Sequence, residues 1–211
     1  MKKISRILLA TVSILLLSCT YAERYEANDS GDEIIVKFSA DQTINETIVQ
    51  AFDDVDAEAS LEESVQRLST ELGVPFVYSR LTSGREVIVK IPMRQVYELV
   101  AERIRNSDEV ENTVIAKRTI GDVSNGPDEI LVTIDSSRIE LGPNVDANAL
   151  AALLINDQRF PVICDIRSDG RLAVAPDFEH LVARLVKELG SRPDIDYAQA
   201  NYQVRHYDNK Q

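Results

Sequence analysis

The side chains that could perform catalysis are few in this chain. It contains two cysteines and two histidines, at Cys19, Cys164, His180 and His206. Neither histidine lies at a spacing typical of zinc ligands, and no Gly-x-Ser-x-Gly turn supplies a nucleophile. Because the pattern offers no nucleophile with a base beside it, the sequence predicts a protein without enzymatic activity. We likewise expect no cofactor, no bound metal and no catalytic residue.

A group of carboxylates precedes and enters a predicted helix. Its members are Asp53, Asp54, Asp56, Glu58, Glu62 and Glu63. The group lacks the Asp-x-Asp-x-Asp-Gly order and the distant glutamate of a calcium-binding loop. Negative charge is also favourable at the start of a helix. We therefore interpret these residues as a solvated loop and helix start rather than a loose calcium site.

The first nineteen residues predict export. Met1-Lys2-Lys3 is a basic start, and the apolar run at 7–17 is far shorter than the roughly 20 residues that cross a bilayer as a helix. Residues 1–18 are thus predicted to be a signal peptide. Leu16-Leu17-Ser18-Cys19 resembles the bacterial lipobox, which implies cleavage before Cys19 and lipid, palmitate included, on that residue. Since Thr20 follows the cysteine, the resemblance implies an outer-membrane lipoprotein that faces the periplasm.

An ordinary signal peptide with an incidental cysteine is the alternative. The formal net charge of the whole chain is −12, and loss of the basic signal peptide would make the exported part more acidic. This charge argues against nucleic acid and anionic headgroups as partners, so a lipid anchor would hold the protein at the membrane. Lipidation of Cys19 would leave Cys164 without a disulfide partner, and we expect it to be a buried, inert thiol in a strand.

Two segments without periodicity divide the exported part. Residues 19–32 are polar and acidic, which is typical of a flexible tether. Residues 119–128 concentrate turn-forming residues and predict a linker. The two units on either side are 33–118 and 129–205, and 206–211 form a C-terminal tail.

The two units carry the same order of predicted elements. Both open with a β-branched strand, at 33–38 and at 129–134. A helix follows in each unit. The first has Leu61, Val65, Leu68 and Leu72 on one face, a capping box at Ser60 and Glu63, and Gly73 at its end. The second runs from Asp146 to about Asn156, with Leu150, Leu153 and Leu154 directed inward.

A hairpin, a second helix and a closing strand complete each unit. The hairpins turn at 82–84 and at 168–170 and stop at Pro92 and Pro176. The second helices bury Val96, Leu99, Val100 and Ile104 in the first unit and Phe178, Leu181, Val182, Leu185 and Leu189 in the second. The closing strands are 110–116 and 195–202.

The repeated order strand–helix–strand–strand–helix–strand predicts the fold. It indicates an α+β protein of two tandem ferredoxin-like (βαββαβ) units, each with an antiparallel sheet and helices on one face. We expect each unit to close its own four-stranded sheet.

Parts of both units resemble the prodomain of subtilisin-like serine proteases, a family that also occurs as free inhibitors. The matching stretches are 68–80, 84–89 and 108–111 in the first unit and 192–202 in the second. In that family a Glu-Pro pair follows the last strand, whereas Gln199 and Ala200 stand here. The second unit also resembles, more faintly, the periplasmic domain of Tol/Exb-type energy-transduction proteins, in 130–135, 139–142 and 164–169.

The prodomain resemblance implies a non-catalytic module that inhibits a subtilisin-like protease, or helps it fold, in trans. A sheet face would pack on two protease helices while the C-terminal extension, 201–207, lies in the substrate cleft as an added strand. The resemblance implies protein-binding roles for Glu109, Glu111, Asp194, Asp196, Tyr197, Tyr202 and Val204. The acids among them would cap helices of the protease. The alternative is a structural or assembly lipoprotein that binds another envelope protein.

Overall fold

The computed structural model describes residues 33–40, 43–51, 55–117, 128–139 and 145–201. The strands are β1 (Glu33–Phe38), β2 (Val77–Leu81), β3 (Val87–Lys90), β4 (Val110–Lys117), β5 (Asp128–Ile134), β6 (Val162–Ile166), β7 (Leu172–Pro176) and β8 (Ile195–Ala200). The helices are α2 (Thr43–Gln50), α3 (Val55–Leu72), α4 (Met93–Arg105), α5 (Ala147–Ile155) and α6 (Phe178–Gly190). The predicted signal peptide, tether and lipidated Cys19 lie outside the described residues.

The fold is α+β, as predicted, with two four-stranded antiparallel sheets. Sheet A has the strand order β2-β3-β1-β8, and sheet B has the order β4-β5-β7-β6. The expectation that each unit closes its own sheet is wrong, because the last strand of each unit lies in the sheet of the other. Ile34 of β1 is opposite Ala200 of β8, and Val114 of β4 is opposite Leu131 of β5.

This exchange follows from the pairing of two strands that are neighbours in the sequence. β4 and β5 flank the segment predicted as an inter-unit linker, yet they pair up to Lys117 and Asp128. The side chains of those two residues form an ion pair at 2.7 Å. Strands that follow one another along the chain commonly pair in antiparallel fashion through a short connection. Since β4 joins sheet B in this way, its place beside β1 is filled by β8.

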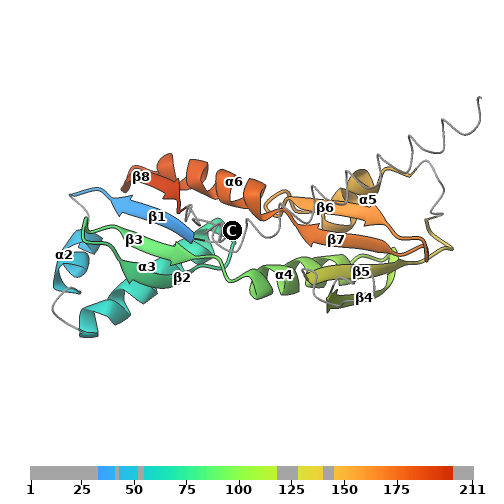
Figure 1. Cartoon of the computed structure of the whole chain (residues 1–211), viewed down its shortest axis with the longest axis horizontal. Helices are drawn as coiled ribbons and strands as arrows, with labels where there is room; N and C mark the ends of the chain where they lie inside the picture. The colour runs from blue at the N-terminus through green and yellow to red at the C-terminus, as the bar shows by residue number, and fades with distance from the viewer. Residues whose placement is uncertain (1–32, 41–42, 52–54, 118–127, 140–144, 202–211) are drawn as a thin grey trace, which may run out of the picture.

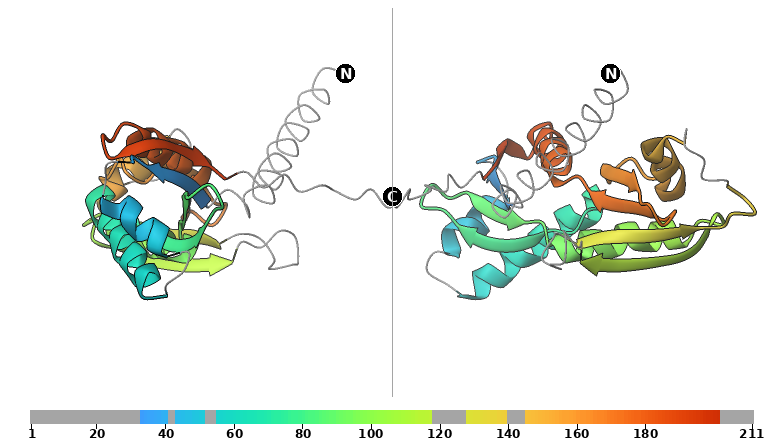
Figure 2. Two further views of the ribbon diagram at one scale, coloured as in Figure 1. Left: turned by 90° about the vertical axis from the view of Figure 1, so that its left-hand side faces the viewer. Right: turned by 45° about the vertical axis from the view of Figure 1, so that its right-hand side comes forward.

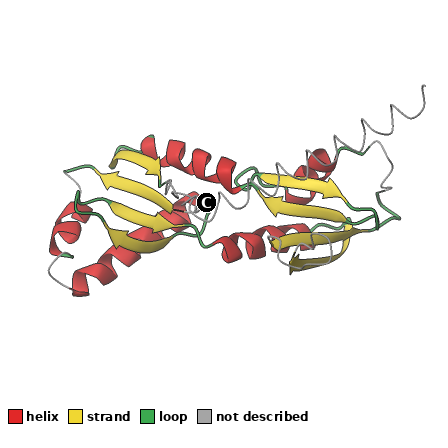
Figure 3. Cartoon of the chain, viewed as in Figure 1, coloured by secondary structure: helices red, strands yellow, loops and turns green. Residues whose placement is uncertain are grey.

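The helix before each exchanged strand packs on the same sheet as that strand. α4 packs on β4, β5 and β7 of sheet B, whereas α6 packs on β8 and β1 of sheet A. α3 contacts β2 and α5 contacts β6, so each sheet is covered by one local and one exchanged helix. Figures 1 and 2 show the two sheets end to end along the molecule, with α4 and α6 beginning near its middle. Figure 3 shows the same arrangement of helices and strands.

One buried cluster runs through both sheets and the helices that cover them. In β1, every second residue is buried (Ile34, Val36 and Phe38), as a strand with one covered face requires. Near the middle of the molecule, where the chain passes from one half to the other, Tyr97 of α4 lies close to Phe178 of α6. Their ring centroids are 6.1 Å apart. Both rings are buried. The two exchanged helices therefore meet through this ring contact near the points where they begin.

The apolar faces of the second helices are confirmed. Phe178, Leu181, Val182, Leu185 and Leu189 of α6 are all buried, as are Val96, Val100 and Ile104 of α4. Leu99 is half-buried.

The local helices confirm most of the predicted face and correct two details. Leu61, Val65 and Leu68 of α3 are buried, and Gly73 ends that helix with a φ of 64°. The predicted capping box is wrong, because Ser60 lies inside α3, where its carbonyl accepts a hydrogen bond from the Ser64 hydroxyl.

Asp146 caps the start of α5. Leu150 and Leu154 of this helix are buried as predicted, but Leu153 is 62% exposed. Ala151 and Ile155 are buried instead. The four buried residues of α5 form two pairs spaced by four, 150 with 154 and 151 with 155, which share one face of the helix. Leu153 lies outside that face.

The exchange makes a prediction about the cleaved chain. A specific protease site introduced between residues 119 and 127 should, once cut, leave two fragments that remain one particle in size-exclusion chromatography. Each sheet contains strands from both fragments, so separating them would break β1–β8 pairing and expose the cluster around Tyr97. Cleaved protein in denaturant is the control, since there the fragments should separate. Separate elution of folded fragments under native conditions would show that each half closes its own sheet.

Candidate functional site

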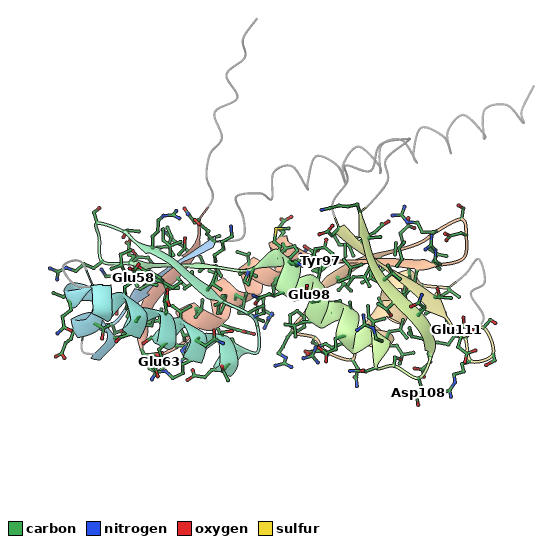
Figure 4. All side chains as sticks on the ribbon, turned by 90° about the horizontal axis from the view of Figure 1, so that it is seen from below. Glu58, Glu63, Tyr97, Glu98, Asp108 and Glu111 are labelled. Carbon is green, nitrogen blue, oxygen red and sulfur yellow. The ribbon has the colours of Figure 1, made fainter. Side chains whose placement is uncertain are left out.

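The residues expected at the protein-binding site fall into two groups that the fold keeps apart. Asp194, Asp196 and Tyr197 lie in or next to β8 of sheet A, whereas Glu109 and Glu111 lie at the start of β4 of sheet B. Figure 4 labels Glu111 at one end of the molecule, and Glu58 and Glu63 of α3 in the other half. The four acids therefore cannot act on one small contact.

Asp194 is occupied by a partner within the chain. Arg192 donates from Nε and Nη2 to its two carboxylate oxygens at 3.0 and 3.1 Å. These hydrogen bonds lower the pKa of Asp194. Arg192 also contacts Glu71 of α3 at 2.8 Å. Asp194 thus helps to fix the turn before β8 against the first unit.

The next residues of β8 are also tied to the first unit, but they remain exposed. The Ser39 hydroxyl donates to Asp196 at 2.7 Å. The Tyr197 hydroxyl donates to Glu86, and that carboxylate raises the pKa of Tyr197. Tyr197 is still 38% exposed. Its ring and the Asp196 carboxylate are therefore available for a partner.

A network that the sequence analysis missed joins the two ends of sheet A. Arg80 donates to both carboxylate oxygens of Glu33 at 2.9 and 3.0 Å, and Asn201 donates to Glu33 at 2.6 Å. Arg80 and Glu33 belong to β2 and β1, so the bridge spans β3. Burial raises the pKa of Glu33, but the hydrogen bonds from Arg80 and Asn201 outweigh it and the pKa lies below its usual value.

Sheet B repeats this bridge. Arg167, which follows β6, donates to Glu129 of β5, and β7 lies between the two strands. Glu33 and Glu129 both stand at the opening of their units, and their side chains are 13% and 12% exposed. A signal was present in the sequence, since both units begin Glu-Ile, but the arginine partners could not be assigned from spacing alone.

The acids of β4 have a different environment. Glu109 accepts a hydrogen bond from the Ser107 hydroxyl, which lowers its pKa, and its carbonyl accepts from the amide of Asp135 at 2.9 Å. Glu111 is exposed. These carboxylates lie beside the hairpin partner of β4 and far along the chain from the C-terminal tail.

The predicted cleft-binding tail begins where β8 ends. Asn201 donates its backbone amide to the Glu33 carbonyl at 3.0 Å, so the last described residue lies beside the first. Tyr202 and Val204 lie outside the described residues, as does His206. The chain therefore enters sheet A and leaves it at the same point.

Cys164 and His180 are the remaining reactive side chains in the described part of the chain. Burial, with a smaller effect of Asp146, raises the pKa of the partly buried Cys164 thiol to about 12. His180 is exposed, and its Nδ1 lies 2.7 Å from Asp177. Within the described ranges, no group of three His, Cys, Asp or Glu residues could hold a metal ion. Over the same ranges, no helix is long and apolar enough to cross a membrane.

Comparison with family models, with curated proteins and with solved structures gave no match to this chain.

The Glu33 network predicts a pH-dependent contribution to stability. Glu33→Gln should lower the free energy of unfolding at pH 7 by about 1–2 kcal/mol, because it leaves charged Arg80 without its carboxylate partner. The folded pKa of Glu33 lies below 4.5, so its contribution is present above that pH and is lost as the pH falls through the folded value. The gap between wild type and variant in urea denaturation should therefore narrow below pH 4.5.

Glu63→Gln, at an exposed position of α3, is the matched control and should change stability little at any pH. An equal loss in both variants, or a gap that stays constant with pH, would contradict the assigned role of Glu33.

The raised pKa of Cys164 predicts slow thiol chemistry. In the soluble fragment 20–211 this is the sole cysteine. Because a thiol with a pKa of about 12 is protonated at pH 8, a disulfide reagent such as DTNB should react with the folded protein far more slowly than with the urea-unfolded protein. Equal rates for the two forms would show that the thiolate is freely formed in the folded state.

Proposed function

We propose that this protein is a non-catalytic binding module that inhibits a subtilisin-like serine protease, or assists its folding, in trans. In this proposal Cys19 carries a lipid anchor and the protein faces the periplasm from the outer membrane. The contact surface is the part of sheet A that includes β8, together with the tail that follows it.

The exchange of closing strands is the observation that carries the proposal. The stretches with the prodomain resemblance at 68–80 and 84–89 form the end of α3 and the β2–β3 hairpin, while the one at 108–111 lies at the start of β4 in sheet B. The stretch in the second unit, 192–202, supplies β8, which pairs with β1 in sheet A. The stretches at 68–89 and 192–202, more than a hundred residues apart, are therefore neighbours in one compact unit.

The same exchange removes an objection to the proposal. The strand that closes the first unit in sequence, β4, continues into β5 and leaves no free extension. The strand that closes sheet A in space is β8, and it is followed by the C-terminal tail. Inhibition by a product-like tail requires such an extension next to the closing strand.

We also propose that the units are ferredoxin-like. Each sheet places the first and third strands of a unit in the centre, the second at one edge and a closing strand at the other. The helices that precede the closing strands pack with them. This is the order that a βαββαβ unit would have, with the last helix and strand contributed by the other half.

Within the contact surface, the residues of β8 have distinct roles. Asp194 is neutralised by Arg192 and positions the strand. Asp196 and Tyr197 are exposed and would meet the protease. The tail, with Tyr202 and Val204, would add a strand in the substrate cleft. Glu109 and Glu111, in sheet B, lie outside this surface.

The experiment is inhibition of a panel of subtilisin-like proteases by the soluble fragment 20–211. We expect tight, saturable inhibition with one protease bound per chain, because the proposed contact surface includes β8, which lies in sheet A alone. Deletion of 202–211 should abolish it while leaving the folded part intact by circular dichroism.

A matched control replaces exposed Glu111 of sheet B by Gln, which should leave the inhibition constant unchanged. Absence of inhibition by folded, uncleaved protein would refute the protease proposal and favour a role in envelope assembly. Full potency after deletion of the tail would refute the tail mechanism alone.

A further inference from the structure

Strand β4 presents an unusual edge. It is the longest described strand, with 8 residues, and it ends sheet B on one side. Val114 and Ile115, near its middle, are 47% and 38% exposed. An edge strand carries backbone amides and carbonyls that can pair with another extended chain. Exposed apolar side chains in the middle of such an edge favour that pairing.

The devices that usually protect an edge are weak at this position. Lys117 could discourage pairing by its charge, but it is paired with Asp128 of the neighbouring strand at 2.7 Å. The register irregularity lies between Val110 and Asn112, at the start of the strand. From Asn112 onward, the ladder with β5 is regular through Lys117.

The charge at the start of β4 selects the kind of partner. Asp108 and Glu111 are both exposed, and they lie together at one end of the molecule (Figure 4). Arg138 approaches Asp108 only to 3.9 Å. The chain as a whole has a net charge of −12, so a second copy would bring like charges together at this edge. A segment with positive charge would instead be attracted.

We propose that the outer edge of β4 binds an extended, basic segment of a partner protein as a fifth strand of sheet B. Val114 and Ile115 are consecutive in a regular ladder, so their side chains lie on opposite faces of sheet B. Successive apolar side chains of that segment would pack beside Val114 on one face and beside Ile115 on the other, and basic side chains at its end would lie near Asp108 and Glu111. The main-chain hydrogen bonds would supply affinity, and the apolar stretch with a basic end would supply selectivity.

This site is separate from the one proposed for the protease. β8 and the tail belong to sheet A, while β4 belongs to sheet B at the other end of the molecule. The proposal therefore stands without the protease function. If both hold, the protein can bind a protease at one end and an extended basic segment at the other.

The probe is a labelled, end-blocked peptide of about eight residues, the length of a long strand, with a central run of valines between lysines at both ends. It is titrated into the soluble fragment 20–211 by fluorescence anisotropy at about 0.15 M salt, where attraction between exposed charges farther apart than about 8 Å is largely screened. A second peptide of the same sequence has alternate backbone amides methylated, so it keeps its charge but cannot complete a ladder. We expect saturable binding of the first peptide and at least tenfold weaker binding of the second.

Variants locate the site. Val114→Lys and Ile115→Lys should each weaken binding about tenfold, because they add like charge and remove apolar contact. Val77→Lys is the matched control, since Val77 is 40% exposed on β2, the edge strand of the other sheet. It should leave the affinity unchanged. In the unmodified protein, amide chemical-shift changes on titration should centre on 110–117.

Three results would overturn the proposal. They are a lack of saturable binding by the unmethylated peptide, equal affinity of the methylated peptide, and chemical-shift changes centred away from β4. The last measurement uses unmodified protein, so it decides the question even if a lysine variant fails to fold.

Discussion

The pairing of β4 with β5 is the constraint on which the rest of this structure depends. The two strands follow one another along the chain, and a single antiparallel ladder joins them as far as Lys117 and Asp128. Once β4 is committed to sheet B, α4 must cover that sheet, because few residues separate the helix from the strand. The edge of β1 is then open, and α6 with β8 returns from the far half of the chain to fill it. The result is one buried cluster shared by two sheets, closed at its centre by Tyr97 and Phe178.

The polar network of sheet A connects the exchanged strand β8 to the strands of the first unit. Glu33 binds Arg80 of the same unit and Asn201, which follows β8, so one carboxylate joins the local strands to the strand that came from the other half. The contacts of Arg192 with Glu71, and of Ser39 with Asp196, do the same at the other end of β8. Several polar contacts therefore fix the imported strand, in addition to its ladder with β1. A strand held in this way can present a terminal segment at a defined position, which is what the proposed inhibitor mechanism needs.

Much of the local structure could be predicted from the sequence. The β-branched openings of the two units, the apolar stripe of α6 and the turn at Gly170 are short-range signals, and the structure confirms all three. The start of α3 and the inward face of α5 were predicted less well. Ser60 suits a cap by type and spacing, but the preceding residues extend the helix to Val55. Leu153 is apolar, yet it is exposed, and Ala151 and Ile155 are buried with Leu150 and Leu154 instead. The Glu33 and Glu129 bridges were missed because each joins strands through side chains that cross a third strand.

The sequence by itself determined the α+β class, the acidic charge and the order of the elements apart from α2, which was not predicted. These properties arise from periodicity, turn residues and composition, which are local. Tertiary structure decided which strands share a sheet, and hence which of the candidate residues lie together. A closing strand could pair either with the edge of β1 or with the edge of β5. Each unit supplies one closing strand, β4 or β8, so the pairing depends on which edge each strand joins. We attribute the outcome to β4 and β5 being consecutive along the chain, with ten residues, 118–127, between them, because consecutive strands commonly pair.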